Sequence, residues 1–206
     1  YIVQLAIMYA FSINLAYKKG LIEKEKLSGF MNELLSVVPE KVKEALKMEN
    51  ECKTIAKKYK DSSDIFFIGR GIDYVSCMEA SLKLKEISYI HSEAYPAGEL
   101  KHGTISLITE KTPVFAIITK TQTFEKMINN IKEVKSRGAK VILLCTEDLK
   151  IPKDTADDIL YLPKTDELFM SIPTTIISQL ISYHFALCLG NDVDKPRNLA
   201  KSVTVE

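Results

Sequence analysis

Beyond residue 60, short apolar runs alternate with longer stretches of helical period. The runs read IFFIG, PVFAIIT, AKVILLCT and DDILYLP. Such runs are typical of strands buried on both faces, and strands that alternate with helices form a parallel sheet with right-handed crossovers. The pattern therefore predicts an α/β fold, with a flavodoxin-like parallel sheet sandwiched by helices.

Helices are expected between these runs, at residues 74–89, 121–137 and 168–189. Gly138 and Gly190 follow the last two helices, where a left-handed residue commonly ends a helix. A further short strand is predicted near residues 92–95, with a turn at residues 96–98.

The first quarter of the chain has helical period only. Helices are predicted up to Gly20, at residues 25–38 with an end set by Pro39, and at residues 41–60. The chain thus divides into a helical segment (1–60), an α/β domain (61–190) and a C-terminal tail without helical period (191–206). Because Tyr1 is not an initiator methionine and no capping residue precedes the first helix, we expect a fragment of a longer gene product.

Composition excludes several classes of partner. The 206 residues are 46% hydrophobic, which suffices for a core, and the net charge of +1 argues against a nucleic acid or an anionic membrane. Pro173 and His184 interrupt the apolar segment near the C-terminus, so no membrane span is predicted. The four cysteines form no CxxC pair, which favours free thiols and a reducing cytoplasm.

Three charged residues on the helix at 74–89 are candidates for catalysis. Glu79, Lys83 and Glu86 fall in one narrow stripe of that helix. An ordinary surface charge stripe is one interpretation. Apolar residues on both sides of the stripe instead predict a helix with little exposed surface, on which charges must be paired or line a cleft. A carboxylate in a cleft, one turn from a lysine, suits proton transfer.

The three histidines have different expected roles. His102 lies in GELKHG, beyond the expected carboxyl edge of the sheet, and either moves a proton near pH 7 or is a surface residue without a task. His91 is expected to end a helix and His184 to pack in the core. Without an HExxH motif or a cysteine cluster, no metal site is predicted.

Two further motifs leave alternatives open. The sequence IGRG after the first strand is either an anion site or a tight turn of purely structural use. Lys201 lies five residues from the end, where lysines are normally solvated, but its apolar neighbours also allow a docked tail with a nucleophilic amine.

The sequences LKLKEISYIHSEAYPAGELKHG and DVDKPRNLAKSVTVE resemble the C-terminal isomerase region of the glutamine:fructose-6-phosphate amidotransferases, the glucosamine-6-phosphate synthases. The resemblance runs from about Tyr1 to Glu206. It implies a sugar isomerase (SIS) fold, with this chain covering the end of a first SIS lobe and all of a second. It also implies that the glutaminase domain and most of the first lobe, with its phosphate-binding loops, are missing, so that the fragment alone is impaired or inactive.

The resemblance further implies a role for each matching residue. Lys201 forms a Schiff base with C2 of fructose 6-phosphate, Glu86 moves a proton between C1 and C2, and Lys83 assists it. His102 helps to open the sugar ring, reaching the site from the second subunit of a homodimer, and Ala200 lies at the substrate. This chemistry needs no metal or organic cofactor.

Two other functions are compatible with an SIS fold. One is a regulatory module that only senses a phosphosugar, and the other is a phosphosugar deglycase or deaminase. A pure sensor needs no Schiff-base lysine, and the chain shows no basic helix-turn-helix segment. The C-terminal motif DKPRNLAKSVTVE favours the synthase over both.

Overall fold

The computed structural model describes residues 1–197 and contains a five-stranded parallel sheet in the order β2-β1-β3-β4-β5. The strands are β1 (Asp64–Gly69), β2 (His91–Pro96), β3 (Pro113–Ile118), β4 (Lys140–Cys145) and β5 (Asp158–Tyr161). This order is that of flavodoxin-like folds, in which the strand order reverses between β1 and β3. The predicted α/β class and all five predicted strands are confirmed.

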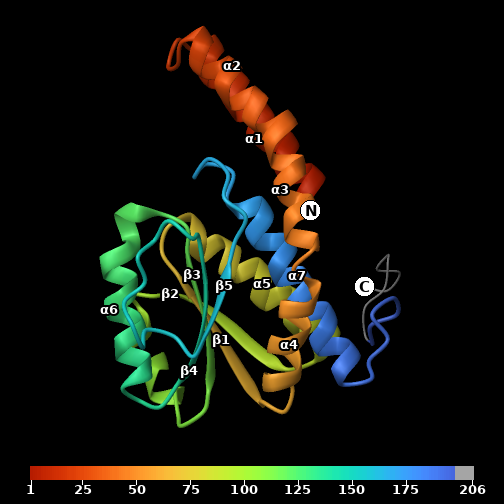
Figure 1. Ribbon diagram of the computed structural model, residues 1–206, viewed down its shortest axis with the longest axis vertical. Coiled ribbons are helices and arrows are strands. Elements are labelled where there is room, and N and C mark those ends of the chain that lie inside the picture. Colours follow the sequence, from red (N-terminus) through yellow and green to blue (C-terminus); the bar gives the residue numbers. More distant parts are fainter. Residues whose placement is uncertain (198–206) are drawn as a thin grey trace, which may run out of the picture.

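Helices cover both faces of the sheet (Figure 1). One face carries α4 (Glu49–Tyr59), α5 (Ile72–Ser88) and α7 (Ser171–Cys188), and the other carries α6 (Phe124–Lys135), which follows the short 3-10 turn η4 (Thr121–Thr123). Successive residues of β1 alternate between the two cores, since Phe67 packs towards α5 and α7 and Phe66 packs towards α6. The apolar runs of the sequence are therefore buried on both sides.

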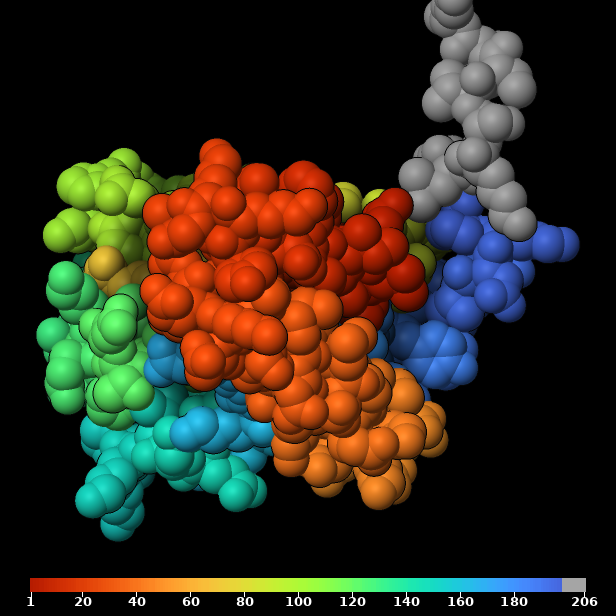
Figure 2. Space-filling model, turned by 90° about the horizontal axis from the view of Figure 1, so that it is seen from above, coloured from red at the N-terminus to blue at the C-terminus, as the bar shows by residue number. Residues whose placement is uncertain are grey.

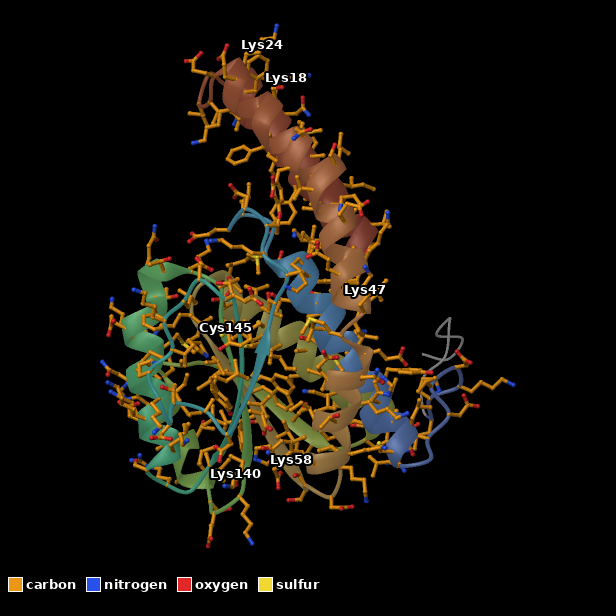
Figure 3. The ribbon with its side chains drawn as sticks, viewed as in Figure 1. Lys18, Lys24, Lys47, Lys58, Lys140 and Cys145 are labelled. Atoms are coloured by element: carbon orange, nitrogen blue, oxygen red, sulfur yellow. The ribbon has the colours of Figure 1, made fainter. Side chains whose placement is uncertain are left out.

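The first quarter of the chain forms a helical stalk, residues 1–46, which rises above the sheet (Figures 1 and 2). It consists of α1 (Ile2–Lys18), α2 (Lys24–Asn32), a π-helical turn η1 (Glu33–Val37) and α3 (Val38–Leu46). Lys18 and Lys24 mark its tip in Figure 3, at the turn between α1 and α2. Among the helices of residues 1–197, none is long and apolar enough to cross a membrane.

The prediction that Pro39 ends a helix is wrong. The helical run continues from α2 through η1 into α3, and Pro39 lies in the first turn of α3. The wide turn before it lets the Val38 N–H bond to the Glu33 carbonyl, five residues back. Pro39 has no N–H to donate to the preceding turn of this continuous run, and a π turn is one way in which a helix absorbs such a local irregularity. The break instead falls after Leu46, so the predicted third helix is divided between α3 and α4.

Candidate active site

The charged stripe on α5 is a set of contacting side chains. The Lys83 ammonium lies 2.6 Å from Oε2 of Glu86 and 4.0 Å from Oε1 of Glu79. The Glu79 side chain is only 11% exposed, and its Oε1 has no hydrogen-bond partner among residues 1–197. The Lys83 ammonium thus lies near two carboxylates, and its closer contact, with Glu86, holds that carboxylate in a defined position.

The sequence predicted α5 to be apolar and buried on both flanks of this stripe, and on one flank that is wrong. Val75, Met78 and Leu82 are 48, 50 and 42% exposed. On the opposite flank Ala80 and Leu84 are buried. The reason is that α5 packs against α7 on one side only, while its other side adjoins β2, the edge strand of the sheet. The candidate carboxylates therefore lie on a half-buried helix.

Glu86 lines a pocket of about 450 Å³ between the end of α5 and the start of β2, together with Tyr89, His91 and Arg197. A second pocket of about 600 Å³ lies beside Glu79, towards Tyr1 and Tyr95. Both pockets flank α5. A carboxylate that is half-buried, paired with a lysine and open to a pocket is a candidate general base.

His102 lies at the other end of the domain. It ends the 3-10 turn η2 (Leu100–His102), which follows the carboxyl end of β2 and precedes η3 (Thr104–Leu107). Its side chain is 65% exposed, with Nε2 4.0 Å from a Glu99 carboxylate oxygen. Glu86 is in the last turn of α5, near the amino end of β2, so the six residues of β2, about 20 Å of strand, separate the two. The structure does not bring Glu86 and His102 together in one chain.

Ala200 and Lys201 lie outside the described residues. The part of the tail that precedes them does contact α5: Asn191 donates hydrogen bonds to the carbonyls of Ile87 and Ser88, and the Arg197 guanidinium lies over the ring of Tyr89. Sequence reasoning missed these three polar side chains. Their only signal was the position of Asn191 directly after the helix-ending Gly190.

The IGRG turn has a structural use, as its second interpretation proposed. Arg70 donates two hydrogen bonds to Oδ1 of Asn130 on α6, at 3.1 and 3.0 Å. A Cβ on Gly69 would lie 2.6 Å from the main chain of Asp73, so only glycine lets α5 begin so close to β1. Asp73 itself, which sequence reasoning missed, is buried and accepts hydrogen bonds from the N–H and the hydroxyl of Thr119.

Of the other two histidines, His91 lines the Glu86 pocket and His184 does not. His91 was expected to end a helix but begins β2, where Nδ1 lies 2.8 Å from Asp64 at the exposed amino end of the sheet. His184 is buried in α7, as predicted, and lies 3.5 Å from Glu49. Burial lowers the pKa of His184 below its ordinary value.

No group of side chains in residues 1–197 has the arrangement of a metal site. Among the cysteines, Cys52, Cys77 and Cys145 are buried. Burial raises the pKa of Cys52 and of Cys145, at the end of β4 in Figure 3, to about 12. Such thiols are inert at neutral pH, so these cysteines serve packing.

Comparison with known families agrees with the α/β fold. The family model of the SIS domain matches residues 58–189. The chain belongs to the SIS-domain family. Within it, the chain is 48% identical over all 206 residues to the glutamine–fructose-6-phosphate aminotransferase (isomerizing) of Clostridium tetani, and 44% identical to that of Thermococcus kodakarensis. The chain spans 34% of the length of each of these relatives.

Solved structures show the same relationship. The C-terminal domain of glucosamine-fructose-6-phosphate aminotransferase from Francisella tularensis superposes with a TM-score of 0.83 at 35% identity, over 90% of this chain and 52% of that domain. A glucosamine-6-phosphate deaminase from Thermotoga maritima shares the fold, with a TM-score of 0.56 at 23% identity over 92% of this chain and 52% of that one.

Proposed function

We propose that this chain is the isomerase part of a glutamine–fructose-6-phosphate aminotransferase, which converts fructose 6-phosphate and glutamine-derived ammonia to glucosamine 6-phosphate. The observation that carries the proposal is the Lys83–Glu86 pair at a pocket that the C-terminal segment also lines. Relatives that bear this activity in their names match the chain along its whole length, which supports the assignment.

The proposed chemistry uses three side chains. The Lys201 amine adds to the C2 carbonyl of the open-chain sugar and water leaves, giving a Schiff base. Ammonia then displaces the lysine amine at C2, and Glu86 takes a proton from C1 and returns it at C2. Lys83, 2.6 Å from Glu86, holds that carboxylate in place for the first proton transfer. Ala200 contacts the substrate beside Lys201.

His102 is proposed to act in the site of a second copy of the chain. In one chain the length of β2 separates it from Glu86, and its imidazole is exposed. A two-fold dimer that places the carboxyl edge of one domain against α5 of the other brings both side chains to one sugar.

The dimer proposal is tested by mixing two inactive variants, Glu86→Gln and His102→Asn, of the complete gene product that contains this chain. Each mixed dimer has one site with both residues intact, so random exchange of subunits restores about a quarter of the wild-type activity. If mass spectrometry showed that mixed dimers had formed and the mixture still had no activity, a site shared between subunits would be refuted.

The proposed activity is tested by trapping. Borohydride reduction in the presence of fructose 6-phosphate, again on the complete gene product, is expected to leave an adduct on Lys201, located by peptide mass mapping. Lys201→Arg is the control, since it keeps the charge but cannot form a Schiff base at neutral pH. Binding of the sugar without an adduct would favour a phosphosugar-sensing module over the enzyme.

The same proposal places the protein in the cytoplasm, without a nucleic acid or a membrane as partner. The near-neutral net charge and the buried free thiols support this placement.

A further inference from the structure

We propose that Tyr89, Asn191 and Arg197, here called the tail clamp, are positioning residues that fix the C-terminal segment beside Glu86 and so set where Lys201 can reach. This inference rests on the proposed function, because it gives the clamp a role through Lys201. It concerns residues for which the proposed chemistry has no direct use.

Asn191 joins the ends of two helices. After α7 the chain turns at Gly190, whose φ is +74°, and the Asn191 N–H bonds to the Ala186 carbonyl at 2.9 Å. The Asn191 side-chain amide then donates to the carbonyls of Ile87 and Ser88, both at 3.1 Å. Carbonyls in the last turn of a helix have no partner within that helix. Asn191 therefore caps α5 and fixes the start of the tail against it.

Tyr89 and Arg197 make the second attachment. The main-chain N–H of Arg197 donates to the Tyr89 hydroxyl at 2.8 Å, and the Cζ of the Arg197 guanidinium lies 4.0 Å from the Tyr89 ring centroid. Tyr89 holds a left-handed φ of +65°, which is unfavourable for an aromatic residue. The contacts that its ring and hydroxyl make with Arg197 offset the strain of this conformation.

Between the two attachments the segment is folded on itself. The Asp192 carboxylate accepts hydrogen bonds from the main-chain N–H groups of Asp194 and Lys195, at 2.9 and 3.1 Å. Such a turn reduces the number of conformations open to the chain between Asn191 and Arg197. The path of the segment is thus set at both ends and in the middle.

The clamp lies at the candidate site. Tyr89 is three residues after Glu86, and Glu86, Tyr89 and Arg197 line the same pocket of about 450 Å³. Lys201 is four residues beyond Arg197, and four residues span at most about 14 Å. Fixing Arg197 at this pocket therefore keeps the main chain of Lys201 within about 14 Å of it, a shorter reach than attachment at Asn191 alone would give, which raises the effective concentration of the amine at the site.

The test compares Arg197→Ala with Arg197→Lys in the complete gene product. Arg197→Ala is expected to lower kcat and the rate of borohydride trapping on Lys201 about tenfold with KM for fructose 6-phosphate unchanged, since the lysine is present but less often in place. Arg197→Lys keeps a cation over the Tyr89 ring, and it should restore most of the rate. Tyr89→Phe, which keeps the ring and loses the hydroxyl, should fall between the two.

Lys195→Ala is the matched control, because Lys195 is an exposed neighbour that enters the turn through its main chain only. It is expected to behave as wild type. Wild-type kcat and trapping in Arg197→Ala would overturn the inference, as would a loss of rate matched by a lower midpoint of unfolding, since Arg197 would then be merely structural. If the wild-type protein itself formed no adduct on Lys201, the proposed function would fail first and the clamp with it.

Discussion

At the scale of single residues, the buried ionisable groups outside the site reveal most about stability. Asp73, at the start of α5, accepts hydrogen bonds at 2.9 and 2.5 Å from the N–H and hydroxyl of Thr119, the residue that follows β3. Burial raises the pKa of Asp73, although the two hydrogen bonds oppose that shift. This carboxylate ties the start of α5 to the end of β3, beside the point where the strand order reverses.

Asp73→Ala is expected to lower the free energy of unfolding by roughly 2–3 kcal/mol, because it leaves two buried donors of Thr119 unpaired. Asp73→Asn keeps an acceptor for one of the two Thr119 donors, so it should lower the free energy of unfolding less. Urea unfolding measures both. Asp61→Ala, on an exposed turn, is the control with a change within about 0.5 kcal/mol; an equal effect of Asp73→Ala and Asp61→Ala would show that the Thr119 contacts stabilise nothing.

His184 makes stability depend on pH. Burial lowers its pKa, Glu49 opposes that lowering and Lys53 adds to it. In the unfolded chain the imidazole takes up a proton near pH 6.5, but in the folded chain it stays neutral to lower pH. The stability that His184 contributes is therefore present above about pH 6.5 and is lost as the pH falls through the folded pKa.

His184→Gln should accordingly flatten the loss of stability between about pH 7 and 5, measured by urea unfolding at several pH values. His91→Gln, at the exposed end of β2, serves as the control. Parallel pH profiles for wild type and His184→Gln would contradict this assignment.

At the scale of elements, the ends of helices follow from local sequence. Gly138 follows α6 with a φ of +89°, and a Cβ there would lie 2.9 Å from the Cα of Glu110. Both the left-handed backbone and the close approach require glycine. The same reasoning predicted Gly190 at the end of α7, and the structure confirms it with a φ of +74°.

Gly138→Ala is expected to lower the free energy of unfolding by about 1–3 kcal/mol. Gly29→Ala is the contrasting variant, since Gly29 lies within α2 with open space around its Cα and should gain about 0.5–1 kcal/mol of local helix stability. Calorimetry of the two variants separates the effect of strain at residue 138 from the effect of replacing any glycine. If Gly29→Ala were also destabilised, strain at Gly138 would not be the explanation.

Where element predictions were wrong, a neighbour in space decided the outcome. Pro39 does not end a helix, because the π turn η1 precedes it and Glu33 in that turn bonds to the Thr165 hydroxyl and the Asp166 N–H, which anchors the turn to the loop before α7. Val75, Met78 and Leu82 are apolar but exposed, because β2 is an edge strand. Neither the contact of Glu33 with the loop before α7 nor the edge position of β2 can be read from the local sequence.

At the scale of the whole molecule, the apolar surface of the stalk is the feature that contacts within a single chain do not explain. One side of α1 exposes four apolar side chains, each more than half exposed: Val3, Ile7, Met8 and Phe11. An apolar surface of this kind on a single chain marks a contact with another chain or domain.

The 206-residue chain is therefore expected to self-associate or to bind a hydrophobic dye, and the double variant Ile7→Gln with Phe11→Gln should reduce both. Sedimentation velocity over a range of concentrations measures the association. The polar pair Glu23→Gln with Glu25→Gln, near the tip of the stalk, is the control. Monomeric wild-type protein without dye binding would contradict the prediction.

The sequence by itself determined the strands, the class of the sheet, the residues of the α5 stripe and the ends of α6 and α7, because these depend on apolar runs, helical spacing and glycine conformation within a few residues. Only the tertiary structure decided that His102 lies a strand length away from Glu86, and that Tyr89, Asn191 and Arg197 attach the tail. The physical reason is distance along the chain. Asn191 and Ile87 are 104 positions apart, and the contact between them forms only when the whole sheet brings the ends of α5 and α7 together.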